Sequence, residues 1–106
     1  MSPAQAIAAL DRQLRRHGQD VTLHANGREA SVTVRGRPSG YRPDELGQGV
    51  LQGMTKIVLS PTGLEAYGRP RKLDTMQYGG WSQTVEVVDP IWIDGEVVRF
   101  EIWATG

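Results

Sequence analysis

The dipeptide Asp94-Gly95 separates two alternating runs of residues and so restricts the C-terminal third of the chain to a β-hairpin. Aspartate followed by glycine tolerates the positive φ angles that a tight two-residue turn requires. After the turn, Val98, Phe100 and Ile102 occupy every second position, with charged residues between them. Because successive side chains of a strand point to opposite faces, this run predicts a strand with one buried face over residues 96–105.

A second hairpin is expected over residues 21–35. Val21 and Leu23 alternate with polar residues before Asn26-Gly27, another dipeptide that favours a tight turn, and the residues after it alternate again as a return strand. The apolar run at residues 54–59 predicts a further strand.

Residues 83–89 form the next alternating stretch. The period of two places Val85 and Val87 on one face of the expected strand, and Thr84 and Glu86 on the other. With the hairpin that follows, this makes the C-terminal third the clearest β region of the sequence.

Residues 3–17 carry the signals of an α-helix. Ser2 is placed to cap the N-terminus, Pro3 suits the first helical position, and Gln5 has the spacing of a capping box. Gly18 ends the segment after a basic run that suits the negative C-terminal end of a helix. Apolar residues at helical spacing form one stripe: Pro3, Ile7, Leu10 and Leu14.

The other side of this helix is basic, because Arg12, Arg15 and Arg16 lie there. One interpretation is a solvated face with no partner. The other is a docking face for a partner that carries acidic residues.

Together these elements predict one mostly β domain over residues 1–106, a small antiparallel β-barrel or sandwich with an N-terminal α-helix and a long mobile loop. Several short antiparallel strands in so small a chain favour closure, because closure removes the exposed strand edges that invite aggregation. The helix then plugs one end of the barrel or lies across one side.

From Gly36 to Gly53 the alternation stops for 18 residues, of which five are glycine and two are proline. Connections of this length are uncommon in small domains and are usually functional or disordered. The segment is therefore interpreted as a loop that is mobile alone and becomes ordered on binding, with a surface loop of no particular role as the alternative. The residues expected to contact a partner are Arg37, Tyr41, Arg42, Asp44, Glu45, Leu46, Val50 and Leu51.

Residues that carry chemistry are sparse. The chain has no cysteine, which excludes disulfides, thiolate zinc sites and cysteine nucleophiles. His17 and His24 are the only histidines, and neither has metal-ligand spacing, so no metal or cofactor is expected. We predict no catalytic residues and no enzyme activity; a hydrolase that uses a carboxylate pair, drawn from the acidic residues near Asp94, is the remaining enzymatic alternative.

Composition also bears on nucleic acid and membrane partners. The 12 basic and 12 acidic residues give zero net charge, without the strong basic footprint of most nucleic-acid-binding proteins. A small β-barrel that binds single strands through Arg35, Arg37, Arg42 and its aromatic residues is nevertheless kept as an alternative. No apolar run approaches the roughly 20 residues that span a bilayer, and the N-terminus lacks the pattern of a signal peptide, so a soluble protein of the cytosol is expected.

Several strings of the sequence resemble small proteins from the head–tail gene clusters of tailed phages and prophages. One string comprises residues 42–46, 48–53 and 57–62, and the other comprises residues 87–90 and 94–101. The family is that of head–tail connector, or head-closure (stopper-like), proteins. The chain departs from it over residues 73–81, where a shorter or irregular strand is expected.

This resemblance implies a structural virion protein at the head–tail junction, made in the host bacterial cytoplasm. Its copies would form a ring, with the portal or adaptor protein above and a tail-completion or tail protein below. Packaged DNA would pass nearby, and the ring would help close the DNA channel. No membrane partner is implied.

Overall fold

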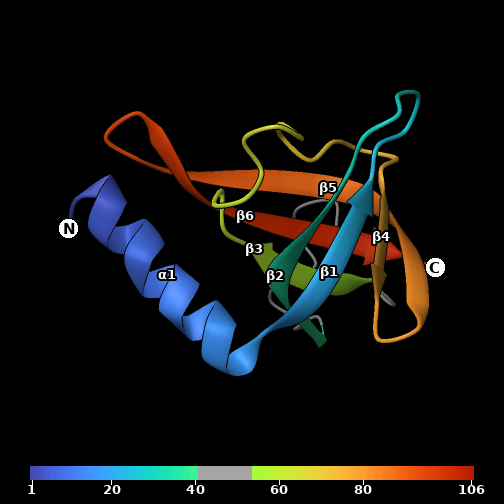
Figure 1. Cartoon of the computed structure of the whole chain (residues 1–106), viewed down its shortest axis with the longest axis horizontal. Helices are drawn as coiled ribbons and strands as arrows, with labels where there is room; N and C mark the ends of the chain where they lie inside the picture. Colours follow the sequence, from blue (N-terminus) through green and yellow to red (C-terminus); the bar gives the residue numbers. More distant parts are fainter. Residues whose placement is uncertain (41–53) are drawn as a thin grey trace.

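The computed structural model describes residues 1–40 and 54–106, in which one helix accompanies a closed barrel of six antiparallel strands in the order β1-β2-β3-β6-β5-β4 (Figure 1). The prediction of a mostly β fold with an N-terminal helix is confirmed, and the architecture is a barrel. The elements are α1 (Pro3–His17), β1 (Gln19–His24), β2 (Ser31–Gly40), β3 (Thr55–Leu59), β4 (Thr75–Tyr78), β5 (Trp81–Ile93) and β6 (Glu96–Thr105).

Helix α1 begins and ends where the sequence predicts. The backbone N–H of Gln5 donates to Ser2 Oγ at 3.2 Å, and Ser2 N–H donates to Gln5 Oε1 at 3.0 Å, which completes the capping box. Gly18, at the C-terminus of the helix, has extended backbone angles that any residue can adopt. The backbone conformation therefore does not require glycine here, but the available space does. A Cβ at this position would lie 2.5 Å from the carbonyl oxygen of Leu14 and 2.7 Å from that of Gly36, closer than atoms can approach.

Both hairpins form. Asp94 and Gly95 have φ angles of 49° and 78° and make the predicted two-residue turn between β5 and β6. The turn between β1 and β2 is longer than Asn26-Gly27 alone, because the closing hydrogen bond runs from Ala25 N–H to the carbonyl of Ala30.

The predicted start of the long loop at Gly36 is wrong. Strand β2 continues to Gly40, and residues 36–40 pair with β3 from Leu59 back to Thr55. The alternation is hidden in the sequence because the inward positions here are Gly36 and Pro38 instead of large apolar residues. A Cβ at Gly36 would lie 2.7 Å from Leu59 Cδ2 and 2.9 Å from Val21 Cγ2, so neighbouring side chains already fill this space.

Strand β5 contains a bulge that the sequence pattern does not reveal. The register with β6 shifts between Val85 and Val87, and the two valines therefore do not share a face. Val85 is buried inside the barrel, whereas Val87 packs outside it against Met54 and Trp103. The expectation that both point to the same core is wrong.

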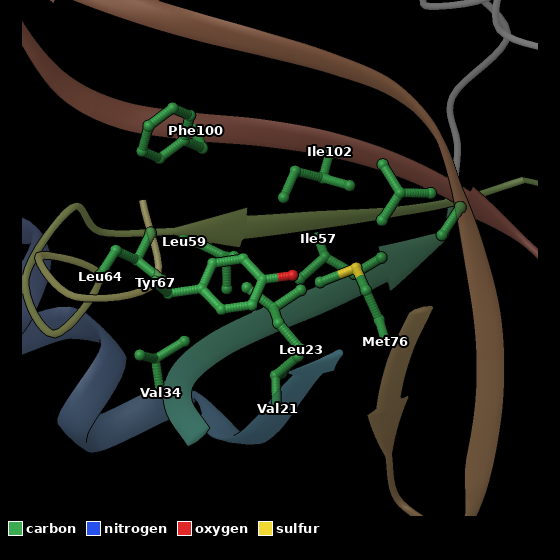
Figure 2. Packing of buried hydrophobic residues seen from close by; sticks show 12 residues of the cluster. Val21, Leu23, Val34, Ile57, Leu59, Leu64, Tyr67, Met76, Phe100 and Ile102 are labelled. Atoms are coloured by element: carbon green, nitrogen blue, oxygen red, sulfur yellow. The ribbon is translucent and has the colours of Figure 1, made fainter. Parts of the chain in front are cut away.

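The barrel interior is filled by apolar side chains from every strand (Figure 2). Leu64 and Tyr67 also enter it, from the connection between β3 and β4. The buried cluster comprises Val21, Leu23, Val34, Ile57, Leu59, Leu64, Tyr67, Met76, Val85, Phe100, Ile102 and Ala104.

Asp74 is a buried carboxylate that ties the connections of the barrel together. It is 1% exposed and accepts hydrogen bonds from the Tyr67 hydroxyl at 2.8 Å and from the backbone N–H groups of Asn26 and Arg71 at 3.0 Å each. Burial of Tyr67, together with the adjacent Asp74 carboxylate, raises the pKa of its hydroxyl well above the ordinary value. These bonds satisfy the buried charge, so Asp74 has a structural role.

Candidate functional site: a basic groove at the end of the helix

The C-terminal half of α1 and the middle of β2 together form a basic groove. Arg12, Arg16 and His17 come from the helix and Arg37 comes from the strand. With Ala9 and Gln13 they line a hollow of about 430 Å³ that opens to solvent. The groove thus joins two sets of residues that the sequence suggested separately, the basic helix face and the first residue of the partner-binding set.

The predicted basic helix face is divided between two hollows. Arg12 and Arg16 are four positions apart and therefore share one face of the helix, on the groove. Arg15 lies about 100° around the helix from Arg16 and lines a second hollow, together with Asp11 and Thr62. There the Thr62 hydroxyl donates to Asp11 at 2.8 Å.

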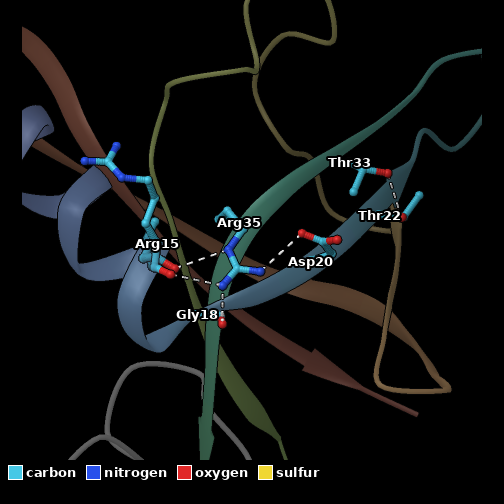
Figure 3. Close-up of polar contacts among 7 residues, drawn as sticks. Arg15, Gly18, Asp20, Thr22, Thr33 and Arg35 are labelled. Carbon is cyan, nitrogen blue, oxygen red and sulfur yellow. Dashed lines mark hydrogen bonds and ion pairs between the residues drawn. The ribbon is translucent and has the colours of Figure 1, made fainter.

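The groove walls are fixed to each other by Arg35, which the sequence suggested as a phosphate contact (Figure 3). Its guanidinium donates to the carbonyl oxygens of Gly18 at 2.6 Å, Leu14 at 3.3 Å and Arg15 at 3.4 Å, and pairs with Asp20 at 3.3 Å. The last carbonyls of a helix have no partner within it, and a cation there also meets the negative end of the helix dipole. Arg35 therefore holds the helix end against β2 and is occupied by this role.

The three arginines of the groove carry uncompensated charge, and His17 is its fourth basic residue. All four are exposed, and none pairs with a carboxylate within residues 1–40 and 54–106. Like charges four positions apart on a helix cost about 0.2–0.5 kcal/mol, and Arg37 adds a further cation from the strand. The helix dipole accounts for Arg16 and His17 in the last turn but for neither Arg12 nor Arg37. An anionic group bound in the groove would relieve this repulsion.

The groove adjoins a mostly apolar hollow along α1. Ala9 and Gln13 line both the basic groove and a second hollow of about 290 Å³ between the helix and the β5–β6 hairpin. Leu10, Ile91 and Val98 are among the apolar residues of that second hollow. The two hollows thus adjoin at Ala9 and Gln13, and their lining is mostly apolar near the N-terminus of the helix and basic near its C-terminus.

Within residues 1–40 and 54–106, the three tryptophans do not come together as one base-stacking platform, although Tyr78 and Trp81 line one hollow. Trp81 and Trp92 are exposed but lie near opposite ends of the long strand β5. Trp103 is 5% exposed and packs against Met54 and Val87, with the Lys56 ammonium 5.5 Å from its ring.

Other suggested sites are also dispersed. His24 lies at the opposite end of β1 from His17 and makes a side-chain hydrogen bond with Gln77 at 3.2 Å. Within the described ranges, no three histidine, cysteine or acidic residues are placed to hold a metal ion. The same ranges contain no helix that is long and apolar enough to cross a membrane.

Of the predicted partner-binding loop residues, only Arg37 can be located, on β2. The others lie outside the described residues: Tyr41, Arg42, Asp44, Glu45, Leu46, Val50 and Leu51. Sequence reasoning missed the roles of Arg35 and Asp74, since each depends on neighbours that are distant in the chain.

Comparison with known proteins adds no relative: no family model, curated protein or solved structure matches this chain.

Proposed function

We propose that this protein is a structural component of a tailed-phage or prophage particle that joins the head to the tail. Copies form a ring between the portal or adaptor protein and the tail, and the ring helps close the DNA channel. The protein makes contacts and catalyses no reaction. The resemblance of its sequence strings to head–tail connectors suggests this role.

The observation that carries the proposal is the uncompensated basic groove with its apolar continuation. Such a surface is typical of protein contacts, because arginine is enriched among the residues that anchor interfaces and the buried centre of an interface is mostly apolar. The groove is open to solvent. Among the described residues, its arginines form no ion pair with a carboxylate. It fits an acidic surface of a partner protein better than a small substrate.

A head-completion assay tests the function. Phage heads that lack this protein are mixed with the purified protein and with tails, and the tailed particles are counted by electron microscopy or as infectious units. The wild-type protein is expected to restore tail joining. Failure to bind such heads and to restore joining would exclude the proposed function.

Groove variants extend the same assay. Arg12→Glu/Arg16→Glu is expected to reduce joining at least tenfold, because it reverses the charge of the groove. Arg71→Glu/Lys72→Glu makes the same change of charge at two exposed residues outside the groove and is the matched control. A shortened segment between Gly40 and Met54 separately tests the predicted partner-binding residues.

Nucleic-acid binding is the second candidate, favoured by the three guanidinium groups of the groove. If the three guanidinium groups met phosphates, the logarithm of the binding constant would fall with the logarithm of salt concentration with a slope of about −2 to −3. A titration of single-stranded and double-stranded oligonucleotides at several salt concentrations tests it. Absence of a salt-dependent complex would exclude this candidate.

A further inference from the structure

We propose that the basic groove of one copy binds the β5–β6 hairpin tip of a second copy, so that identical copies associate head to tail. The hairpin tip is defined here as Trp92, Asp94 and Glu96. The inference deepens the proposed function, because it rests on the ring and names the surfaces that would form it.

The hairpin tip has the chemistry that the groove lacks. Asp94 and Glu96 are exposed, and neither has an ion pair or a side-chain hydrogen bond among the described residues. Trp92 is 52% exposed beside them, with the Arg69 guanidinium 5.7 Å from its ring. The tip thus offers carboxylates to a groove lined by arginine and an aromatic ring to its apolar continuation, and aromatic and arginine residues are the commonest anchors of protein interfaces.

The two surfaces lie at opposite ends of α1. Figure 1 shows the β5–β6 hairpin beside the N-terminus of the helix, and its residues Ile91 and Ile93 line the apolar hollow there. The basic groove lies at the other end, near His17. With 15 residues the helix spans about 22 Å. Among the described residues, no ion pair joins Asp94 or Glu96 to Arg12, Arg16 or Arg37 of the same chain, so we assign the contact to a second copy.

This arrangement favours an open-ended or cyclic assembly over a two-fold dimer. A contact between two different surfaces of the same protein leaves one of each surface free at every step, and it closes into a ring when the rotation between copies allows. One contact of a few charges is weak in salt, but each copy of a closed ring makes two of them. Association is therefore expected to depend on both concentration and ionic strength.

A charge-exchange experiment tests the contact with the whole chain. The groove variant is Arg12→Glu/Arg16→Glu, and the hairpin variant is Asp94→Asn/Glu96→Lys. Asparagine tolerates the φ of 49° at position 94, so the turn is kept. Circular dichroism and thermal unfolding verify that both variants fold, and sedimentation velocity measures association in a concentration series that reaches about 1 mM.

The wild-type protein is expected to self-associate at low salt, and each variant alone to associate at least about tenfold more weakly, because its two surfaces then repel. An equimolar mixture of the variants is expected to regain association. In the mixture, the native hairpin of the groove variant meets the native groove of the hairpin variant, and the reversed surfaces also attract each other. The control Arg71→Glu/Lys72→Glu is expected to behave as the wild type.

Several outcomes would overturn the inference. A wild type that stays monomeric throughout the series, variants that associate as well as the wild type, or a mixture that regains nothing would each contradict the contact. Oligonucleotide binding lost in the groove variant with self-association unchanged would instead assign the groove to nucleic acid. The head-completion assay is independent: if tails are joined while the charge exchange fails, the proposed function stands and only this contact is wrong.

Discussion

The replacement of Arg35 by methionine tests how the groove is built. Methionine keeps an apolar side chain of similar length but removes the guanidinium that bonds to three carbonyl oxygens at the end of α1. The bond to Gly18 is the strong one at 2.6 Å, since those to Leu14 and Arg15 are 3.3 and 3.4 Å long. A hydrogen bond from a charged donor contributes about 1.5–3 kcal/mol when buried, and the partial exposure of Arg35 reduces this toward the lower value.

The loss of a cation at the helix C-terminus adds about 0.3–1 kcal/mol, and the exposed pair with Asp20 adds at most a few tenths. The Arg35→Met protein is therefore expected to lose about 2 kcal/mol of unfolding free energy. For a chain of this size, that loss lowers the melting temperature by roughly 8 °C.

Chemical denaturation monitored by circular dichroism measures this loss. Asp20→Asn is the matched control, because it removes the ion pair and leaves the carbonyl bonds, and it is expected to cost less than about 0.5 kcal/mol. If Arg35→Met were no more destabilised than Asp20→Asn, the carbonyl bonds would not hold the helix end, and our account of the groove wall would be refuted.

Three other substitutions test the packing of the barrel. Gly18→Ala forces a Cβ against two backbone carbonyls and is expected to cost about 3 kcal/mol or more in urea denaturation, whereas Gly27→Ala, with open space around it but a positive φ, costs about 1 kcal/mol. Asp74→Ala leaves buried donors without an acceptor and is expected to lower the free energy of unfolding by at least about 3 kcal/mol. A melting temperature near that of the wild type would contradict this expectation. Because the pKa of Tyr67 is raised on folding, the folded state resists loss of its proton, so stability is full below about pH 10 and falls as the pH rises beyond it. Tyr67→Phe should lessen that fall by up to about 1.4 kcal/mol per pH unit, and identical pH profiles for the two proteins would show that Tyr67 does not contribute.

Local signals predict the helix and the hairpins because each depends on residues close in the chain. Ser2, Gln5 and Gly18 mark the helix, and Asp94-Gly95 sets its turn through backbone preference alone. The hairpins also predict antiparallel pairing of neighbouring strands, whereas closure of the barrel needs the pairs β1–β4 and β3–β6, which no hairpin makes.

Tertiary packing decides what the local pattern cannot. Gly36 and Pro38 lack the large apolar side chains that mark the buried face of a strand. Inside the barrel, large residues of the neighbouring strands fill the space next to Gly36. The bulge after Val85 changes which face of the sheet the later residues of β5 occupy. Simple alternation of apolar and polar residues does not reveal such an extra residue.

The groove was predictable only in parts. The arginines of the helix face stand out in the sequence, but nothing local places Arg37 beside them, because this requires the pairing of β1 with β2 and the return of the chain under the helix. Arg35, two positions before Arg37, carries the same charge but donates to the carbonyls at the end of the helix. The sequence spacing alone does not show which of the two arginines lines the groove.

The contact of Gly18 with Gly36, where no side chain separates the two backbones, has a mechanical consequence. A pull on the groove is transmitted to the wall of the barrel through this close backbone approach and through the Arg35 guanidinium. The helix end therefore cannot tilt away from β2 without breaking the Arg35 bonds. A partner held there would be coupled rigidly to β2.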